Sequence, residues 1–453
     1  MTARLLPPEA FGLIAMANVV LRFGKYFATM GVNRALIQRA DIDDMDIRAA
    51  FTSSTTLGVL TAATVIAVAP LAAVYYQTDD VVAVVRWLGL TFVFSSMGAT
   101  ARALLQRRLA FRTTGAIEVA SYAFGYALPT LTLAVSGYGV WSLVAGAIGQ
   151  VAVSSGVAML LTRHSLRPTF RVEPHRRLLG FGFKVSGISV LEFLGSALDT
   201  LVIGRFGTVA QVGIYNRAFM LASLPTYQVQ HGIAKVLFPV LSSGRSDPAA
   251  FAHTLGTASR ASIKLVLPLG IGMALTAPEL VRVVLGDQWL ETVPVFTVLA
   301  PALALRLLST FPGQALDALG RLRWKAIVQA LYVVLLCSAL MVTATNGLDL
   351  TTISLVIAIA IGCRTVAVYT LIYRTGTVDR SFLVGALRTA LGAATATCIT
   401  FIPVLAVLRD TGTPVLLTLA LAIATGGIVL LALFSTSIAR IVRERSRSRS
   451  RRS

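Results

Sequence analysis

Long apolar stretches alternate with short polar loops along almost the whole 453-residue chain. Each stretch holds about 20 residues or more, and a helix of that length, at about 1.5 Å per residue, crosses a hydrocarbon core roughly 30 Å thick. The pattern therefore predicts an all-α integral membrane protein, a polytopic bundle of about 13 transmembrane helices. The expected spans are 11–36, 57–76, 81–104, 114–137, 139–162, 184–206, 212–240, 261–285, 292–318, 325–345, 350–373, 382–408 and 413–436.

The loops between these spans differ in their content of Lys and Arg. With the C-terminus in the cytosol, the inner loops and the tail hold about 25 Lys and Arg, against about 3 in the outer loops. Short positive loops stay on the cytoplasmic side, so we expect a multi-pass protein of the cell inner (plasma) membrane with a cytoplasmic C-terminus. The basic inner segments are 102–112, 163–177, 321–325 and the tail from 440.

The composition agrees with a membrane protein. Hydrophobic residues make up 56% of the chain and charged residues 13%, and the mean hydropathy is +0.77. A soluble domain is about one quarter charged. The net charge of +20 lies mostly in the inner loops and the tail, where orientation and contact with anionic membrane lipids explain it better than nucleic acid does.

An internal repeat relates the first and seventh spans. Five pairs of identical or similar residues are all separated by 201 positions (213 minus 12, for example), with no gap. The repeating unit is therefore six spans, a plan known among transporters. The pairs are Arg4 and Arg205, Gly12 and Gly213, Ala17 and Ala218, Gly31 and Gly232, and Arg34 and Lys235.

The repeat also bears on the start of the chain. The span 184–206 directly precedes the second copy, and its counterpart in the first copy would fall before Met1. We therefore expect a fourteen-helix plan that lacks its first helix in this sequence. The alternative is a true thirteen-span protein with its N-terminus outside the cell.

At this point the chain resembles the polysaccharide exporters of the multidrug/oligosaccharidyl-lipid/polysaccharide (MOP) flippase superfamily, and most closely the Wzx-like, colanic-acid-exporter type. The resemblance covers nearly the whole chain and departs from the family plan only in the missing first span. It implies two six-helix lobes around a central cavity, plus two extra C-terminal helices. The motifs that carry it are LLPPEAFGL at 5–13, MGVNRALIQR at 30–39, GIYNRA at 213–218, LFPVLS at 237–242 and GDQW at 286–289.

The repeat and the resemblance together predict five segments. The tail is low in complexity and rich in Ser and Arg, which favours disorder. The segments are an N-terminal lobe at 1–162, a cytoplasmic basic linker at 163–183, a C-terminal lobe at 184–374, two extra transmembrane helices at 375–438, and a basic disordered cytoplasmic tail at 439–453.

Charges inside spans are costly and are candidates for function. Asn18, Arg22 and Lys25 follow one another at steps of 4 and 3, so they share one helix face. Arg306 lies near the middle of the span 292–318. If the substrate carries a pyrophosphate, as the resemblance implies, these four residues are the candidates that bind it in a cationic cavity. The alternative is that Arg22 or Lys25 pairs with an acidic residue only to hold helices together.

Other charged residues lie inside or at the edges of spans. Glu192 and Asp199 share one helix face, and Glu118 and His231 lie in other spans. These four are candidates for ion coupling or for balancing the cations, because burial raises the pKa of a carboxylate and lets it exchange protons. A packing role for His231 is the plainer alternative. Glu279 and Arg282, three residues apart, are predicted to form a local ion pair.

The sequence contains none of the motifs expected of an enzyme with a nucleotide, metal or nucleophile site. There is no Walker A motif, no cluster of residues with metal-ligand spacing, and no nucleophile elbow. The three cysteines lie inside spans as structural thiols. We therefore expect no enzyme activity, no cofactor and no metal.

The resemblance implies a flippase that moves undecaprenyl-pyrophosphate-linked oligosaccharide from the inner to the outer leaflet for cell-surface polysaccharide synthesis. Its expected partners are this polyprenyl-linked glycan, membrane lipids, a polysaccharide polymerase and glycosyltransferases. Three alternatives stay open. One is a cation-coupled multidrug or organic-ion exporter of the same superfamily, another is a membrane glycosyltransferase or polymerase, and the third is a truncated, inactive family member.

Overall fold

The computed structural model describes residues 2–29, 36–37, 41–169, 186–243 and 248–450. Within these segments the side chains of 26–29, 186–194, 229–243, 248, 250, 322, 434 and 436–450 are not described. The described residues form helices and connecting loops, without any strand. The chain divides into two compact units, Met1–Asn216 and Arg217–Ser453.

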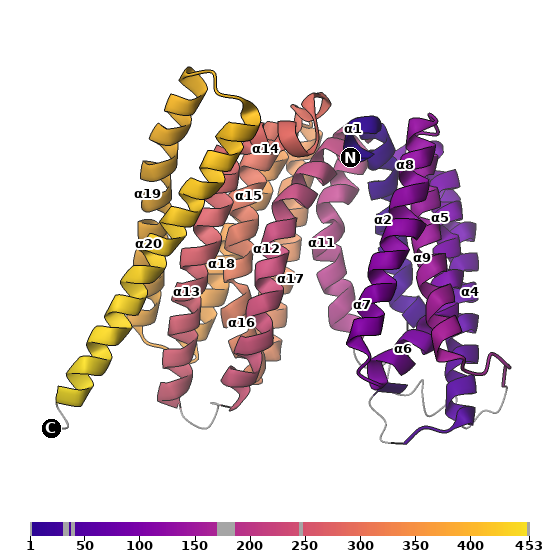
Figure 1. Ribbon diagram of the computed structural model, residues 1–453, viewed down its shortest axis with the longest axis horizontal. Helices are drawn as coiled ribbons and strands as arrows, with labels where there is room; N and C mark the ends of the chain where they lie inside the picture. Colours follow the sequence, from indigo (N-terminus) through magenta and orange to yellow (C-terminus); the bar gives the residue numbers. More distant parts are fainter. Residues whose placement is uncertain (1, 30–35, 38–40, 170–185, 244–247, 451–453) are drawn as a thin grey trace. The chain divides into compact units, whose positions relative to one another are not determined.

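Unit 1 is a helical bundle in which α5 packs against α2, α4 and α9, while α11 packs against α2 (Figure 1). Its second half contains a seven-residue π-helix, η1, between α7 and α8. The elements are α1 (Thr2–Leu5), α2 (Pro8–Thr29), α4 (Asp44–Tyr76), α5 (Asp80–Met97), α6 (Ala99–Arg107), α7 (Phe111–Ala120), η1 (Ser121–Ala127), α8 (Leu128–Val135), α9 (Val140–Thr162), α11 (Ser186–Phe206) and the start of α12 (Val209–Ser243).

Unit 2 is built around α13, which packs against α15, α19 and α20. One apolar cluster of this unit includes Phe251, Leu255, Phe311, Ile372 and Phe382, all of them buried. The elements after α12 are α13 (Pro248–Leu275), α14 (Ala277–Val284), the 3₁₀ helix η4 (Asp287–Trp289), α15 (Thr292–Leu308), α16 (Thr310–Ala318), α17 (Leu322–Thr345), α18 (Leu350–Arg374), α19 (Arg380–Asp410) and α20 (Val415–Ser450).

Nine of the described helices are long and apolar enough to cross a membrane. This confirms the predicted all-α polytopic class, although it does not confirm the number thirteen. The predicted span 11–36 is only partly described, because residues 30–35 lie outside the described segments. The five predicted segments of the chain remain predictions, and α20 is helical as far as Ser450, within the tail for which the sequence predicts disorder.

Several helices begin earlier than the apolar pattern predicts. The span expected at 57–76 is the last part of α4, which begins at Asp44. Asp43 caps its first turn: the Asp46 backbone N–H donates to the Asp43 carboxylate over 2.6 Å, and the Asp46 side chain accepts from the Asp43 backbone. The turns at 44–56 carry polar as well as apolar side chains. A prediction based on long apolar runs therefore does not include them.

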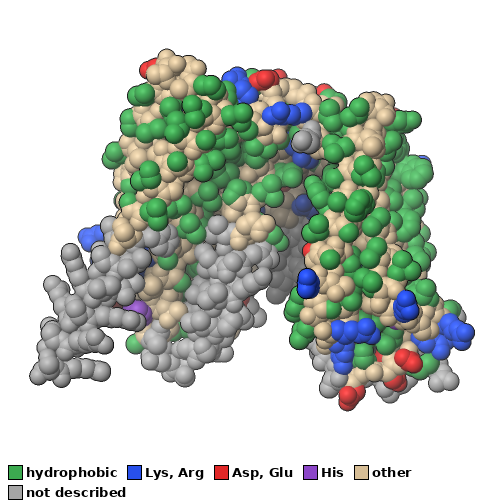
Figure 2. Space-filling view, viewed as in Figure 1, with side chains coloured by type: hydrophobic (Ala, Val, Ile, Leu, Met, Phe, Trp, Pro, Cys, Tyr) green, Lys and Arg blue, Asp and Glu red, His purple; other side chains and the backbone are tan. Residues whose placement is uncertain are grey.

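On the face shown in Figure 2, hydrophobic side chains cover much of the described surface of each unit. On α4, for example, Leu71 is 67% exposed and Val74 is 75% exposed. Such side chains would destabilise a water-soluble fold, but a hydrocarbon core solvates them. Lys and Arg side chains gather at the lower end of unit 1 in the same view, below the apolar band.

Two glycines of the predicted repeat meet in a reciprocal contact inside unit 1. Gly12 of α2 lies against the backbone carbonyl of Val209 at the start of α12, and Gly213 of α12 lies against the carbonyl of Pro8 at the start of α2. Pro8 and Val209 are themselves separated by 201 positions, as the glycines are. Ala17, one turn further from this crossing, is fully buried. The contact therefore has the two-fold character that a repeat with this register produces.

The predicted ion pair between Glu279 and Arg282 is wrong. Glu279 binds Arg409 of α19 through two hydrogen bonds, of 2.8 and 3.0 Å, and Arg282 binds Asp287 at 2.8 Å. Glu279 is buried, and the Arg409 guanidinium offers a planar pair of donors that also reaches the Leu275 carbonyl. A partner 130 residues away cannot be found from helical spacing.

Replacing Gly12 by Ala should destabilise the protein, and Gly213→Ala should do the same. The added Cβ meets a backbone carbonyl in each case, so two helices must move apart, at a cost of about 1–3 kcal/mol. Thermal unfolding of the purified protein in detergent measures the effect. Gly156→Ala on α9 is the control, because nothing lies within 4 Å of its Cβ position. Equal melting temperatures for all three variants would contradict the close crossing.

Candidate functional site

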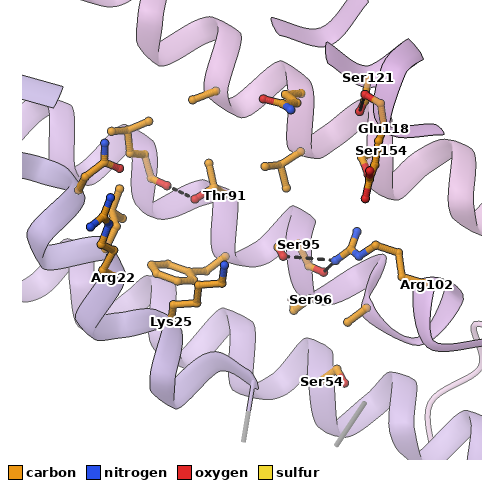
Figure 3. A pocket seen from close by; sticks show the side chains of 18 residues that line it. Arg22, Lys25, Ser54, Thr91, Ser95, Ser96, Arg102, Glu118, Ser121 and Ser154 are labelled. Atoms are coloured by element: carbon orange, nitrogen blue, oxygen red, sulfur yellow. Dashed lines mark hydrogen bonds between the residues drawn. The ribbon is translucent and has the colours of Figure 1, made fainter. Parts of the chain in front are cut away.

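Unit 1 contains a cavity of about 680 Å³ between α2, α4, α5, α7 and α9. Its lining is rich in hydroxyl groups and carries three cations and one carboxylate (Figure 3). The polar and charged lining residues are Asn18, Arg22, Lys25, Ser54, Thr91, Ser95, Ser96, Arg102, Glu118, Ser121, Gln150 and Ser154.

The stripe on α2 that the sequence predicts does line this cavity. Asn18, Arg22 and Lys25 all contribute to the lining, and all three side chains are exposed to it. Arg22 forms no hydrogen bond or ion pair with any residue that the structure describes. It lies 14 residues after Pro8, which is about 21 Å along the helix at about 1.5 Å per residue. The guanidinium is therefore deep within the span and available to a ligand.

Arg102 is a cavity residue that the sequence analysis assigned only to a basic inner segment. Its guanidinium donates to the Ser155 hydroxyl at 2.9 Å, to the Ser95 carbonyl at 2.6 Å and to the Ser95 hydroxyl at 3.3 Å. Figure 3 shows it on the other side of the cavity from Arg22, with Ser95 beside it. These partners are all neutral. A signal was present: Ser95 and Arg102 are seven residues apart and so lie on one helix face.

Gly98 makes this geometry possible. It separates α5 from α6, and a Cβ at this position would clash with the side chain of Ser155 on α9. Only a residue without a side chain lets α9 come this close. Ser155 therefore reaches the Arg102 guanidinium because the two helices touch at Gly98.

Glu118 on α7 is the carboxylate of the cavity, and its side chain is exposed. Within the described segments it forms no ion pair with Arg22 or Arg102. The π-helix η1 follows it and brings the buried hydroxyl of Ser121 to the lining. π-helical turns inside α-helices occur frequently at functional sites.

The remaining predicted site residues are not part of this cavity. Asp199 of α11 accepts a hydrogen bond from the Tyr215 hydroxyl at 2.7 Å and another from the Thr200 backbone. Arg306 is exposed at the end of α15 in unit 2. The side chains of Glu192 and His231 lie outside the described residues. Asn18, Arg22, Lys25 and Glu118 are thus the predicted residues that the structure brings together.

A search for metal-binding groups of three or more His, Cys, Asp or Glu side chains finds none among the described residues. The cavity lining likewise presents a single carboxylate, so its donor set consists of cations, hydroxyl groups and amides. Such groups bind oxyanions and sugar hydroxyls rather than metal ions.

Residues 1–294 of the chain match the model of the family described as "Polysaccharide biosynthesis protein". The chain belongs to this polysaccharide biosynthesis protein family. The match includes the whole of unit 1 and therefore the cavity. It confirms the resemblance that the sequence motifs indicated.

Two curated relatives match about two thirds of the chain. The teichuronic acid biosynthesis protein TuaB of Bacillus subtilis (strain 168) is 28% identical over 306 residues, which are 66% of this chain and 62% of TuaB. The lipopolysaccharide biosynthesis protein WzxC of Escherichia coli (strain K12) is 26% identical over 325 residues, 70% of this chain and 65% of WzxC. The chain thus spans less than two thirds of the length of these relatives.

Solved structures of the MOP superfamily have the same fold. The lipid II flippase MurJ, in an inward closed conformation, matches with a TM-score of 0.74 at 12% identity. The alignment covers 97% of this chain and 96% of the MurJ chain. An inward-facing multidrug resistance transporter of the MATE family matches with a TM-score of 0.56 at 14% identity. That alignment covers 86% of this chain and 93% of the transporter chain. At these identities the likeness establishes the fold of this polysaccharide biosynthesis protein and nothing more.

Arg102→Lys should lower the melting temperature of the protein. A lysine cannot reach Ser95 and Ser155 together, and each hydrogen bond to a charged group contributes about 1.5–3 kcal/mol. Differential scanning fluorimetry in detergent compares this variant with Arg112→Lys, which changes an exposed arginine on α7. If the two substitutions have the same effect, the serine contacts of Arg102 do not stabilise the fold.

Proposed function

We propose that this protein is a flippase that carries a polyprenyl-pyrophosphate-linked oligosaccharide from the inner to the outer leaflet of the plasma membrane. The observation that supports this most directly is the cationic cavity within unit 1. Family membership, the roles of TuaB and WzxC in the synthesis of cell-surface polysaccharides, and the fold shared with the lipid II flippase MurJ support the same class of cargo.

The charge of the cavity favours an anionic ligand. Arg22, Lys25 and Arg102 carry three positive charges, and Glu118 carries one negative charge, so the described lining has a formal charge of +2. A cation in a low-dielectric region is costly unless an anion accompanies it. A pyrophosphate supplies that anion, and its oxygens accept hydrogen bonds from guanidinium and ammonium groups. An exporter of organic cations would need the opposite charge.

The hydroxyl groups of the cavity suit the glycan part of the substrate. Ser54, Ser96 and Ser154 lie on three different helices, α4, α5 and α9, and all line the cavity, as does the amide of Gln150. Hydroxyls and amides both donate and accept hydrogen bonds, so they match the hydroxyl groups of a sugar. The polyprenyl chain would remain in the lipid, against the apolar outer surface.

No nucleotide-binding motif supplies energy, so the membrane potential is the simplest driving force. Moving one negative charge outward across an inside-negative membrane is favourable by about 2.3 kcal/mol per 100 mV. The two leaflets would be reached in turn, by alternating access. In this proposal Arg306 receives the pyrophosphate together with Arg22 and Lys25, and a polysaccharide polymerase and glycosyltransferases are partners of the pathway.

The test is the leaflet distribution of lipid-linked glycan in cells that lack this protein. Inner-leaflet glycan should accumulate, wild-type protein should relieve it, and Arg22→Ala or Lys25→Ala should reduce the transport rate about tenfold or more. One hydrogen bond to a charged group contributes about 1.5–3 kcal/mol, and 1.4 kcal/mol is about a factor of ten. Arg22→Lys should restore part of the rate.

Arg112→Ala is the matched control, because it removes an exposed arginine that does not line the cavity. Its transport rate should stay within about twofold of wild type. An unchanged leaflet distribution in the deletion strain would refute the flippase proposal and favour an organic-ion exporter, which a dye-efflux assay in the same cells would then detect.

Glu118→Gln should increase the affinity for the anionic substrate. The substitution removes the negative charge of the lining, and across a site roughly 10 Å wide with an effective dielectric constant of about 20 this is worth about 1.7 kcal/mol. Binding of a soluble pyrophosphate analogue to the purified protein measures it. If Glu118 instead couples transport to protons, the variant binds as wild type does but loses the dependence of transport on the pH gradient.

A further inference from the structure

Unit 2 has a cavity of its own, of about 510 Å³, where α18 ends and α19 begins. Its walls are the first turns of α13, the loop from Gly376 to Asp379, and the first turn of α19. Phe382 lines it from below, stacked on Tyr369 with ring centroids 5.7 Å apart. This site lies wholly within unit 2, so it does not depend on the proposed transport function.

Arg260 of α13 provides the positive charge of this cavity. Its guanidinium nitrogens lie 3.6 to 3.7 Å from the Cβ positions of Gly256 on the same helix and Gly385 on α19. The two glycines leave room around the guanidinium that any side chain would fill. Among the residues that the structure describes, Arg260 makes no hydrogen bond or ion pair. His253 lies two turns earlier on the same helix face and is exposed at the rim.

Asp379 provides a negative charge in the same cavity. It caps α19: the Phe382 backbone N–H and the Ser381 hydroxyl donate to its Oδ1, at 3.2 and 2.7 Å. These bonds, the one from Ser381 foremost, lower the pKa of the Asp379 carboxyl, so it is ionised at neutral pH. Both of these hydrogen bonds end on Oδ1, so Oδ2 is not used by the helix cap. The carboxylate forms no ion pair with Arg260 within the described segments, so both charges are available to a ligand that carries both signs.

The depth of the cavity narrows the choice of ligand. By length and composition, the candidate membrane spans are Phe251–Leu275 in α13 and Arg380–Asp410 in α19. Asp379, directly before the span of α19, therefore lies where lipid headgroups meet water, on the side that the basic loops predict to be cytosolic, and Arg260 lies nine residues, or about 13 Å, along the span of α13. A ligand there that combines a phosphate with a cation is a zwitterionic phospholipid.

We propose that this cavity binds a phospholipid headgroup with a phosphate and a primary ammonium, the phosphate at Arg260 and the ammonium at Asp379. Arginine is suited to phosphate oxygens, and a primary ammonium donates hydrogen bonds to a carboxylate. A quaternary ammonium cannot donate, and a glycerol headgroup carries no cation. The site therefore selects phosphatidylethanolamine over phosphatidylcholine and phosphatidylglycerol.

The test titrates short-chain phosphatidylethanolamine, phosphatidylcholine and phosphatidylglycerol into the purified full chain in detergent and follows thermal stabilisation. Half-saturation by phosphatidylethanolamine should need about tenfold less lipid than by the other two, and Arg260→Gln should weaken the binding of all three lipids about tenfold, because each of them carries a phosphate. Soluble phosphoethanolamine should compete if the headgroup alone is recognised. If it does not compete, the acyl chains are also needed, and Arg260 dependence still supports the site.

Asp379→Asn is the sharpest variant, because Asn caps a helix as well as Asp does and the fold should be preserved. It should weaken the binding of phosphatidylethanolamine about fivefold while phosphatidylglycerol binds at least as well as before, so the tenfold preference falls to about twofold or less. Arg380→Gln is the control, since it removes one exposed charge at the same depth outside the cavity. Equal stabilisation by all three lipids, or equal losses in Arg260→Gln and Arg380→Gln, would overturn the proposal.

Discussion

Every backbone amide in a lipid-exposed segment must find its hydrogen-bond partner within the protein, because the hydrocarbon core offers none. This constraint explains why the described chain is helical and why its interruptions are where they are. The break at Gly98 lies between the lining residues Ser96 and Ala99 of the cavity in unit 1, and the π-helix η1 begins at the lining residue Ser121. Two interruptions of the helix pattern in unit 1 thus lie beside the cavity.

The same constraint fixes where charges can lie. Glu279 is buried and meets Arg409 through two hydrogen bonds, which compensates both charges. Arg102 is held by neutral serine groups and a carbonyl, and Arg22 has no described partner. A fold that pairs its structural charges yet leaves these two without a counter-ion retains a cost, and a bound anion can offset it.

Hydropathy predicted the helical class because a membrane span needs a long apolar run, which sequence shows directly. It did not predict the start of α4 at Asp44, because those turns are amphipathic. The face formed by Asn18, Arg22 and Lys25 was predictable from helical spacing within one helix. The contact of Arg102 with Ser95 has a spacing signal of the same kind, but its contact with Ser155 has none, since Ser155 is 53 residues away and is close because Gly98 has no side chain. Partners that are distant in sequence carry no local signal.

The reciprocal crossing of Gly12 and Gly213 has a mechanical consequence. Each glycine touches a peptide carbonyl, so the helices meet at one small patch of main chain rather than along interlocking side chains. Such a patch resists compression of the two helices but offers little resistance to a change in the angle between them. Within unit 1, α2 and the start of α12 therefore meet at a point, and the angle at which they cross depends on what packs around that point.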